Sequence, residues 1–303
     1  MILSKIKRRI GRKLGLSRQQ LLENRLHRLA RTIDFTNHSF ASQYDSLFAE
    51  PDSQRNLLRM HELRICSQNG EDGIIMYIFS KIGCTNRKFV EIGIQDGREC
   101  NTANLAINFG WPGHMFEGDL NHVRSAEKYY DSRLTTKKGQ VQIIHAFATM
   151  ENINQTLRQT GLKGEIDLLS IDIDGNDYWI WQAIDVIDPR VVVIEYNAYL
   201  PLDRPLAVKY DPYFNRYNKH KSGFYYGASL TAFHKLAISK GYILLGCDSC
   251  GVNAFFAKKA AAGGDFQDLA DSEAYYGLSS GSKNRPAAAE AFSQIAQMEF
   301  EIV

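Results

Sequence analysis

Hydrophobic residues recur along this chain with two different periods, which divide it into regions. Over residues 2–33 apolar side chains recur every three or four positions, with Arg and Lys between them, which predicts a basic amphipathic helix. From residue 66 short β-rich runs alternate with helical patterns. The predicted strands are 88–93, 113–117, 140–145, 166–173 and 190–196. The predicted helices between them are 99–109, 121–131, 150–160 and 177–187. This alternation predicts an α/β fold with a parallel sheet covered by helices on both faces.

The rhythm changes after residue 197. Residues 198–226 are rich in Tyr, Phe, Lys and Arg, and a helix is predicted at 228–240. Residues 241–259 read as two strands joined by a tight turn. The remainder is predicted to be a loose stretch followed by a short helix at 287–298. The predicted organisation has three parts: a basic helical extension at 1–60, a main domain at 61–260 with an aromatic insertion at 198–226, and a flexible stretch with a short terminal helix at 261–303.

Composition and charge narrow the class of protein. Hydrophobic residues make up 44% and charged residues 23% of the 303 residues, as in globular proteins. No apolar run approaches the ~18–20 residues that span a bilayer, and five cysteines without framework spacing favour a cytoplasmic protein. Residues 1–35 hold ten Lys and Arg against two acids, +8, so the net +2 leaves −6 for residues 36–303. A mildly acidic main domain argues against nucleic acid as a partner.

The basic segment at residues 1–35 leaves two interpretations open. Its cations could hold the protein to an anionic surface at the inner face of a membrane. Alternatively, the helix could pair with a second subunit in a homo-oligomer, or cover the main domain.

A glycine-containing loop follows the first predicted strand. Residues 91–97 read E-x-G-x-x-x-G, between a strand and a helix. Gly93 would let the backbone approach a ligand, and Gly97 would let the helix start close to the strand. Glu91 stands where a dinucleotide fingerprint has its first glycine, which disfavours a pyrophosphate and suits a ligand with cationic groups.

An acidic residue ends the second predicted strand, 20 residues beyond Gly97. Glu117 can accept hydrogen bonds from the two ribose hydroxyls of a nucleoside, and Asp119 could share this role. Together with the glycine loop, these residues predict a nucleoside-binding site.

Five segments carry a resemblance to a known family. Residues 65–260 resemble a class I S-adenosylmethionine-dependent methyltransferase, most closely the FkbM-like branch. The segments are SQNGEDGII (67–75), FVEIGIQDGRECNT (89–102), LLSIDIDGNDYWIW (168–181), VVVIEYNA (191–198) and YYGASL (225–230). The resemblance implies a Rossmann-like, doubly wound seven-stranded sheet whose last strand is antiparallel. It also implies O-methylation of a glycan precursor or natural product, as in polysaccharide biosynthesis.

The same resemblance implies which residues bind S-adenosyl-L-methionine. Glu91, Gly93 and Gly97 would line its methionine end and Glu117 its ribose, with the 148–149 turn beside the adenine. The full predicted set is Gln68, Glu71, Glu91, Gly93, Gly97, Asn101, Glu117, Asp119, Ala148, Thr149 and Asp172. For Gln68 and Glu71 the alternative is that segment 67–72 only begins a helix.

Acidic residues follow the fourth and fifth predicted strands. Because parallel strands end at one edge of the sheet, Asp172, Asp174, Glu195 and Asn197 should converge there. These four are the candidate catalytic residues. A carboxylate could remove the proton of an acceptor hydroxyl. Alternatively, Asp174, Glu195 and Asn197 could hold Mg²⁺, or Asp174 and Asn176 could merely cap the next helix.

The acceptor is the least determined part of the prediction. The insertion at 198–226 lies where an acceptor would bind, and its tyrosines could stack on a sugar ring while its Lys and Arg could hold a phosphate. Three functions remain open: methylation of a sugar or glycan hydroxyl, methylation of a phosphorylated metabolite or other small molecule, and a non-catalytic cofactor-binding scaffold in glycan assembly.

Overall fold

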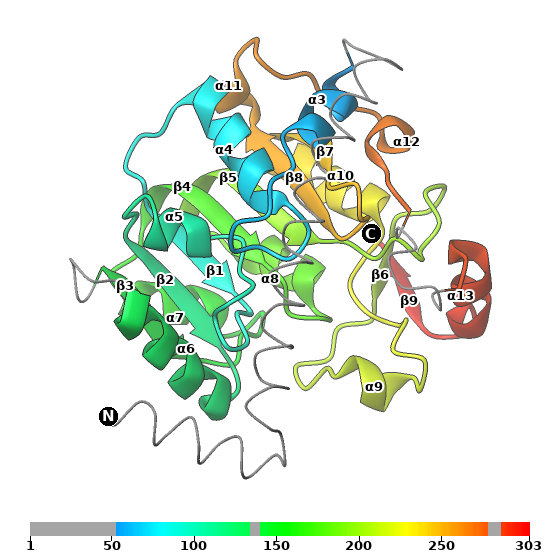
Figure 1. The fold of residues 1–303 in the computed structure, drawn as a ribbon. Helices are drawn as coiled ribbons and strands as arrows, with labels where there is room; N and C mark the ends of the chain where they lie inside the picture. The colour runs from blue at the N-terminus through cyan, green and yellow to red at the C-terminus, as the bar shows by residue number, and fades with distance from the viewer. Residues whose placement is uncertain (1–52, 134–139, 278–285) are drawn as a thin grey trace, which may run out of the picture.

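A seven-stranded sheet forms the centre of the computed structural model, which describes residues 53–133, 140–277 and 286–303 (Figure 1). Its strands are β1 (Phe89–Ile92), β2 (Gly113–Glu117), β3 (Val141–His145), β4 (Gly164–Ile171), β5 (Ile187–Glu195), β7 (Tyr242–Cys247) and β8 (Asn253–Lys258). The order is β3-β2-β1-β4-β5-β8-β7. Strands β1 to β5 pair in parallel, and β8 is antiparallel to both neighbours. The predicted fold class, a Rossmann-like sheet with its last strand antiparallel, is confirmed.

Helices cover both faces of this sheet, as the alternation of strands and helices predicts. One face carries α4 (Glu71–Ile82), α5 (Ala103–Ile107) and α6 (Leu120–Arg133); the other carries α7 (Ile153–Gln159), α8 (Asp177–Ala183) and α10 (Leu230–Ser239). Successive side chains of a strand point to opposite faces, so Leu168 packs in the first core and Leu169 in the second. Both are fully buried, which explains why the strands lack polar alternation.

The strand register brings the carboxyl ends of four strands into one row. Ile92 pairs with Phe116 on one side and with Ile171 on the other, and Ile171 pairs with Ile194. Because β8 runs in the opposite direction, its first residue, Asn253, lies at the same edge. The residues that follow these pairs are therefore neighbours in space.

A second, two-stranded sheet lies beside the main one and was not predicted. Strand β6 (Leu206–Val208) pairs with β9 (Phe300–Ile302) near the C-terminus. Figure 1 shows this pair beside α13 (Ala288–Ile295), with α9 (Arg216–Lys219) on the same side of the molecule. Each of these strands has three residues, too few to give a recognisable hydrophobic period.

Described residues beyond both expected domain limits also pack on the sheet. In α3 (Gln54–Met60), Leu58 is fully buried, and the Gln54 side chain donates to the Leu245 carbonyl. After α11 (Lys259–Ala262), helix α12 (Asp271–Ala274) places Ala274 in the core. This packing differs from the expected extension at 1–60 and flexible stretch at 261–303. The buried apolar residues of these segments, such as Leu58, Phe266 and Ala274, follow no regular spacing, so no periodicity could reveal them.

Two parts of the predicted organisation lie outside the described residues. The first is the basic helix at 2–33, with its membrane or subunit contact. The second is residues 278–285 of the expected flexible stretch. None of the helices in the described part of the chain combines the length and apolar character needed to cross a bilayer.

Candidate functional site

Two glycines let the loop after β1 pack closely on the end of β4 and on α6. Gly93 has φ 85°, and a Cβ there would lie 1.8 Å from the Asp172 carbonyl oxygen. Gly97 has φ 77°, and its Cβ would lie 2.9 Å from the Tyr130 ring. Gly97 therefore seats the loop on α6; it does not begin the next helix, α5, which starts at Ala103. The predicted reason for Gly97 is corrected accordingly.

Glu91 is buried, and its carboxylate is occupied by the protein's own donors. Its oxygens accept from the backbone amides of Asn101 (2.9 Å) and Thr102 (3.1 Å) and from the Thr102 hydroxyl. Burial raises the pKa of Glu91 to about 7, and these hydrogen bonds only partly oppose the shift. This arrangement differs from the expected contact with cationic groups of a ligand: Glu91 holds residues 101–102 against the sheet.

Asn101 links the same loop to β4. Its side-chain nitrogen donates to the Ser170 hydroxyl at 3.1 Å, and the side chain is buried. Asn101, predicted to contact the cofactor, thus ties the loop before α5 to the end of β4.

Glu117 lies beside the glycine loop, as expected for a ribose-binding acid. One carboxylate oxygen accepts from the backbone amides of Ile94 (3.2 Å) and Gln95 (2.7 Å), and the other from Asp119 (2.9 Å). The side chain remains 11% exposed. A carboxylate offers about four acceptor positions, so three backbone donors leave room for a ligand hydroxyl.

Asp119 has a structural role in the described chain. Its Oδ1 accepts from the backbone amides of Asn121 (2.7 Å) and His122 (3.2 Å), at the start of α6. These hydrogen bonds lower the pKa of Asp119, whose side chain is exposed. Helix capping accounts for this residue without the predicted share in ribose binding.

The turn after β3 lies at the same edge, where Ala148 and Thr149 are predicted to flank the adenine. Thr149 precedes α7, and its amide donates to the side chain of Asn152, the N-cap residue of that helix, at 2.9 Å. The Met150 amide donates to the Tyr210 hydroxyl at 3.1 Å. The aromatic segment 198–226 is therefore tied to this turn.

The segment before α4 approaches the edge from the β8 side. Glu71 is buried, and its carboxylate accepts from the Asn69 amide (2.7 Å) and the Asn253 side chain (2.8 Å). Because Asn253 pairs with Glu195, Glu71 lies near the end of β5. Gln68 is exposed. Glu71 thus organises the turn that begins α4, in keeping with the helix-start alternative.

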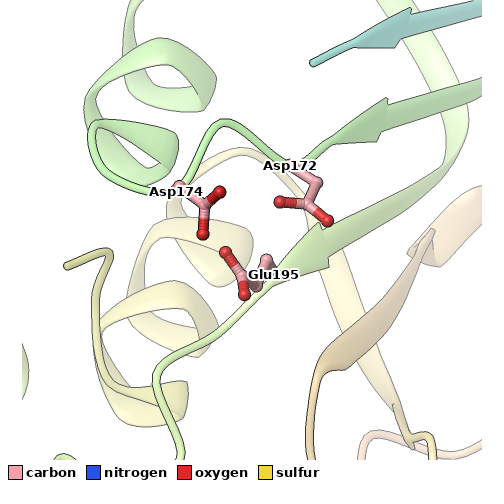
Figure 2. Close-up of side chains that lie close together, drawn as sticks. All are labelled: Asp172, Asp174 and Glu195. Atoms are coloured by element: carbon pink, nitrogen blue, oxygen red, sulfur yellow. The ribbon is translucent and has the colours of Figure 1, made fainter. Parts of the chain in front are cut away.

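Three carboxylates converge at the ends of β4 and β5. Figure 2 shows Asp172, Asp174 and Glu195 pointing toward one another, and one oxygen of each lies within 4.8 Å of the others. Glu195 is 8% exposed, and its Oε2 has no hydrogen-bond partner. Burial and the neighbouring carboxylates raise the pKa of Asp172 and of Glu195 well above their ordinary values. The predicted convergence of these three residues is present.

The turn after β4 aims Asp174 into this cluster. Asp177 fixes the turn, because its two oxygens accept from the amides of Ile173 (2.8 Å) and Gly175 (2.9 Å). Asp174 has φ 55°, an uncommon conformation for a residue with a side chain. Asn176 makes no capping bond to α8. The capping alternative for Asp174 and Asn176 is therefore wrong, and Asp177 is the residue that sequence reasoning missed.

The Asn197 side chain bonds to the backbone of the aromatic segment and does not join the three carboxylates. Its side-chain nitrogen donates to the carbonyls of Phe224 (2.9 Å) and Tyr226 (2.8 Å), and its oxygen accepts from the Tyr199 amide. The side chain is fully buried. These bonds fix the aromatic segment to the end of β5, and they account for Asn197 without a catalytic or metal-binding function.

Arg216 reaches the cluster from α9 and was not among the predicted site residues. Its guanidinium pairs with Asp174, stacks 3.8 Å from the centroid of the Tyr226 ring and donates to the Gly223 carbonyl. The pairing joins residues 42 positions apart. Sequence reasoning placed Arg216 only within a basic, aromatic segment, and no local pattern shows which acid it meets.

Comparisons with known proteins give distant structural likenesses. No family model and no curated protein matches the sequence. A solved structure from Galdieria sulphuraria, named as a candidate sarcosine dimethylglycine methyltransferase, is 14% identical over 57% of this chain, with a TM-score of 0.39; the chain spans 62% of that protein's length. The O-methyltransferase from Bacillus cereus in complex with SAH is 14% identical over 71% of this chain and 89% of its own, with a TM-score of 0.40.

A third solved structure is an S-adenosylmethionine-dependent methyltransferase from Clostridium acetobutylicum. It is 11% identical over 73% of this chain and 98% of its own, with a TM-score of 0.40. Identities and TM-scores this low carry no argument about activity, which rests on the geometry of the site.

Proposed function

We propose that this protein is an S-adenosylmethionine-dependent O-methyltransferase acting on a hydroxyl of a sugar or glycan precursor. The observation that carries the proposal is the layout of the carboxyl edge of the sheet. A glycine loop joined to Glu117 lies on one side of β1, and three convergent carboxylates lie on the other. The first half suits a nucleoside and the second a reacting hydroxyl.

The nucleoside half is suited to ribose by its donors and acceptors. Glu117 retains acceptor capacity beside the amides of Ile94 and Gln95, which it holds in place. No glycine precedes Gly93 in the position that a pyrophosphate loop requires, and Glu91 occupies it instead. This favours S-adenosylmethionine over a dinucleotide.

The second half suits proton removal during methyl transfer. When bound, S-adenosylmethionine would supply an electrophilic methyl group: its sulfur–carbon bond breaks as the acceptor oxygen bonds to the carbon. A carboxylate of Asp172 or Glu195 would take the hydroxyl proton. Burial raises the pKa of both residues, which makes them stronger bases than exposed carboxylates.

The aromatic segment supports a neutral, ring-shaped acceptor. Tyr213 is 85% exposed and Tyr217 68% exposed, so each presents ring surface on which a sugar could stack, although Arg216 lies 5.6 Å from the Tyr217 ring centroid. Two lysines of the segment already have acidic partners: Lys209 with Glu299 (2.8 Å) and Lys219 with Asp211 (2.6 Å). This favours a sugar hydroxyl over a phosphorylated metabolite.

Calorimetric titration tests the cofactor. S-adenosylmethionine and S-adenosylhomocysteine should bind, and NAD should not. Glu117→Gln keeps the side-chain size but replaces an acceptor by a donor, so affinity should fall by about 1–3 kcal/mol. Glu290→Gln, on the exposed side of α13, is the matched control. Tight NAD binding, or equal affinity in both variants, would contradict the proposal.

A second measurement separates an enzyme from a scaffold. Incubation with S-adenosylmethionine and a panel of sugars and sugar nucleotides should release S-adenosylhomocysteine with at least one acceptor. Binding without release for any sugar, phosphorylated metabolite or natural-product hydroxyl would favour the non-catalytic alternative.

A further inference from the structure

We infer that Asp172, Asp174 and Glu195 form a binding site for one hard divalent cation, of the Mg²⁺ or Mn²⁺ type. The inference goes beyond methyl transfer, because it concerns the affinity of the protein for an ion in the absence of any nucleoside or acceptor.

The geometry of the three side chains is the first support. They come from the end of β4, the following turn and the end of β5, and they point at a common centre (Figure 2). One oxygen of each lies within 4.8 Å of the others. Oxygen ligands about 2.1 Å from a single ion are necessarily separated by no more than about 4.2 Å, so small rotations of these carboxylates would suffice for coordination.

A buried oxygen without a partner is the second, independent support. Glu195 is only 8% exposed, and its Oε2 has no hydrogen-bond donor. A buried acceptor left in this state is costly. Other acids of this edge avoid the cost: both oxygens of Asp177 accept backbone amides. No donor of the described residues reaches Glu195 Oε2, and a cation would satisfy this oxygen.

The balance of charge also favours a divalent ion. With all three carboxylates ionised, as coordination of a cation would require, the cluster would contribute −3 and the Arg216 guanidinium paired with Asp174 +1, which leaves −2. Arg216 cannot serve the whole cluster, because its other contacts hold it to Tyr226 and Gly223. A divalent cation would neutralise the remainder.

The choice of ion follows from the ligands. All three donors are carboxylate oxygens, which hard cations prefer and which Cu⁺ or a thiolate-bound Zn²⁺ does not. Three protein ligands leave about three positions of an octahedral ion for water or for an acceptor hydroxyl. The site is thus suited to Mg²⁺ with a partly retained water shell.

Mn²⁺ binding to the full chain tests this inference. Mn²⁺ is titrated without nucleoside, and free Mn²⁺ is followed by electron paramagnetic resonance. We expect one ion per chain with a dissociation constant of about 10⁻⁵–10⁻³ M, displaced by excess Mg²⁺. Glu195→Gln and Asp172→Asn should each weaken binding at least about tenfold. Asp185→Asn, which removes an exposed acid paired with Arg158, should bind as the parent does.

The outcomes separate the cation site from its alternatives. Absence of saturable binding in the parent overturns the inference, as does equal affinity in the parent and both cluster variants. Should the buried variants fail to fold by circular dichroism, Asp174→Asn serves in their place, because Asp174 is 49% exposed. S-adenosylmethionine binding is not needed for any of these measurements, so failure of the methyltransferase proposal would leave the result interpretable.

Discussion

The two halves of the sheet's carboxyl edge use the same residue type in opposite ways. On the β1–β2 side, Glu91 and Glu117 accept hydrogen bonds from backbone amides of the adjoining loops. On the β4–β5 side, Asp172, Asp174 and Glu195 face one another, and Glu195 Oε2 has no donor. Glu91 and Glu117 hold the loops in place through backbone donors, whereas the three facing carboxylates have no backbone donor among the described residues and compete for the single Arg216 guanidinium on Asp174.

This contrast separates acids that accept backbone amides from acids that do not more sharply than burial does. Burial raises the pKa of both Glu91 and Glu195, so burial alone does not distinguish them. What differs is the hydrogen bonding that offsets burial. Backbone amides of the protein donate to Glu91, whereas Glu195 Oε2 has no donor in the described part of the chain and could be satisfied only by a ligand or ion.

The largest expected effect concerns the candidate catalytic residues on the β4–β5 side. Glu195→Gln should lower methyl-transfer turnover by about 10²–10⁴-fold, because it removes a charge that either takes the acceptor proton or holds the cation. Its free energy of unfolding should stay the same or rise, since a buried unpaired carboxylate is removed. Turnover is followed by S-adenosylhomocysteine release, and stability by urea denaturation. Full turnover in Glu195→Gln would break the comparison.

A glycine of the structural half gives the next largest effect. Gly93→Ala places a methyl group where the Asp172 carbonyl oxygen lies, at a φ of 85°. The strain and the clash should cost about 3 kcal/mol of unfolding free energy. Gly264→Ala is the matched control, because a Cβ there would have no neighbour within 4 Å. A loss equal to that of the control would show that the two strand ends are not packed as described.

The sequence predicted most of this fold because the strands are short, buried runs with clear ends. Residues 113–117 were predicted as a strand, and β2 spans Gly113–Glu117. The convergence of Asp172, Asp174 and Glu195 followed from the rule that parallel strands end at one edge. Such inferences need only local patterns and topology.

The remaining features depend on contacts between distant residues. The bonding of Asn197 to carbonyls at 224 and 226, the pairing of Arg216 with Asp174, and the pairing of β6 with β9 leave no periodic trace in the sequence. Asn197 was predicted to be a catalytic residue because it follows Glu195 by two residues at the end of the fifth predicted strand. Its side chain instead found backbone partners, which a strand-end rule does not foresee.

The pH dependence of stability tests the structural half by a third, smaller effect. Burial raises the pKa of Glu91 in the folded protein to about 7, from an ordinary value of 4.5. Stability from this residue is therefore fully present below pH 4.5 and is lost as pH rises through about 7. Glu91→Gln should reduce the loss of unfolding free energy between pH 5 and pH 8 by about 2 kcal/mol, measured by urea denaturation at both pH values.

Other acids set the background of that measurement. Burial also raises the pKa of Glu62 to about 7 and of Asp177 to about 6, so some pH dependence should persist in Glu91→Gln. Glu290→Gln should keep the full slope of the parent. An unchanged slope in Glu91→Gln would mean that the Thr102 and Asn101 donors keep Glu91 ionised throughout.

The smallest expected effect concerns Arg216, whose positive charge lies beside the three carboxylates. Arg216 neutralises part of the charge on Asp174, so Arg216→Gln should strengthen Mn²⁺ binding about threefold by removing a repelling charge. The unfolding free energy should fall by about 1–2 kcal/mol, because the lost interactions are one ion pair, one stacking contact on Tyr226 and the hydrogen bond to the Gly223 carbonyl. Lys219→Gln, also on α9 but paired with Asp211, should leave Mn²⁺ affinity unchanged. Weaker binding in Arg216→Gln would show that Arg216 serves chiefly to aim Asp174, and that orientation outweighs charge in this cluster.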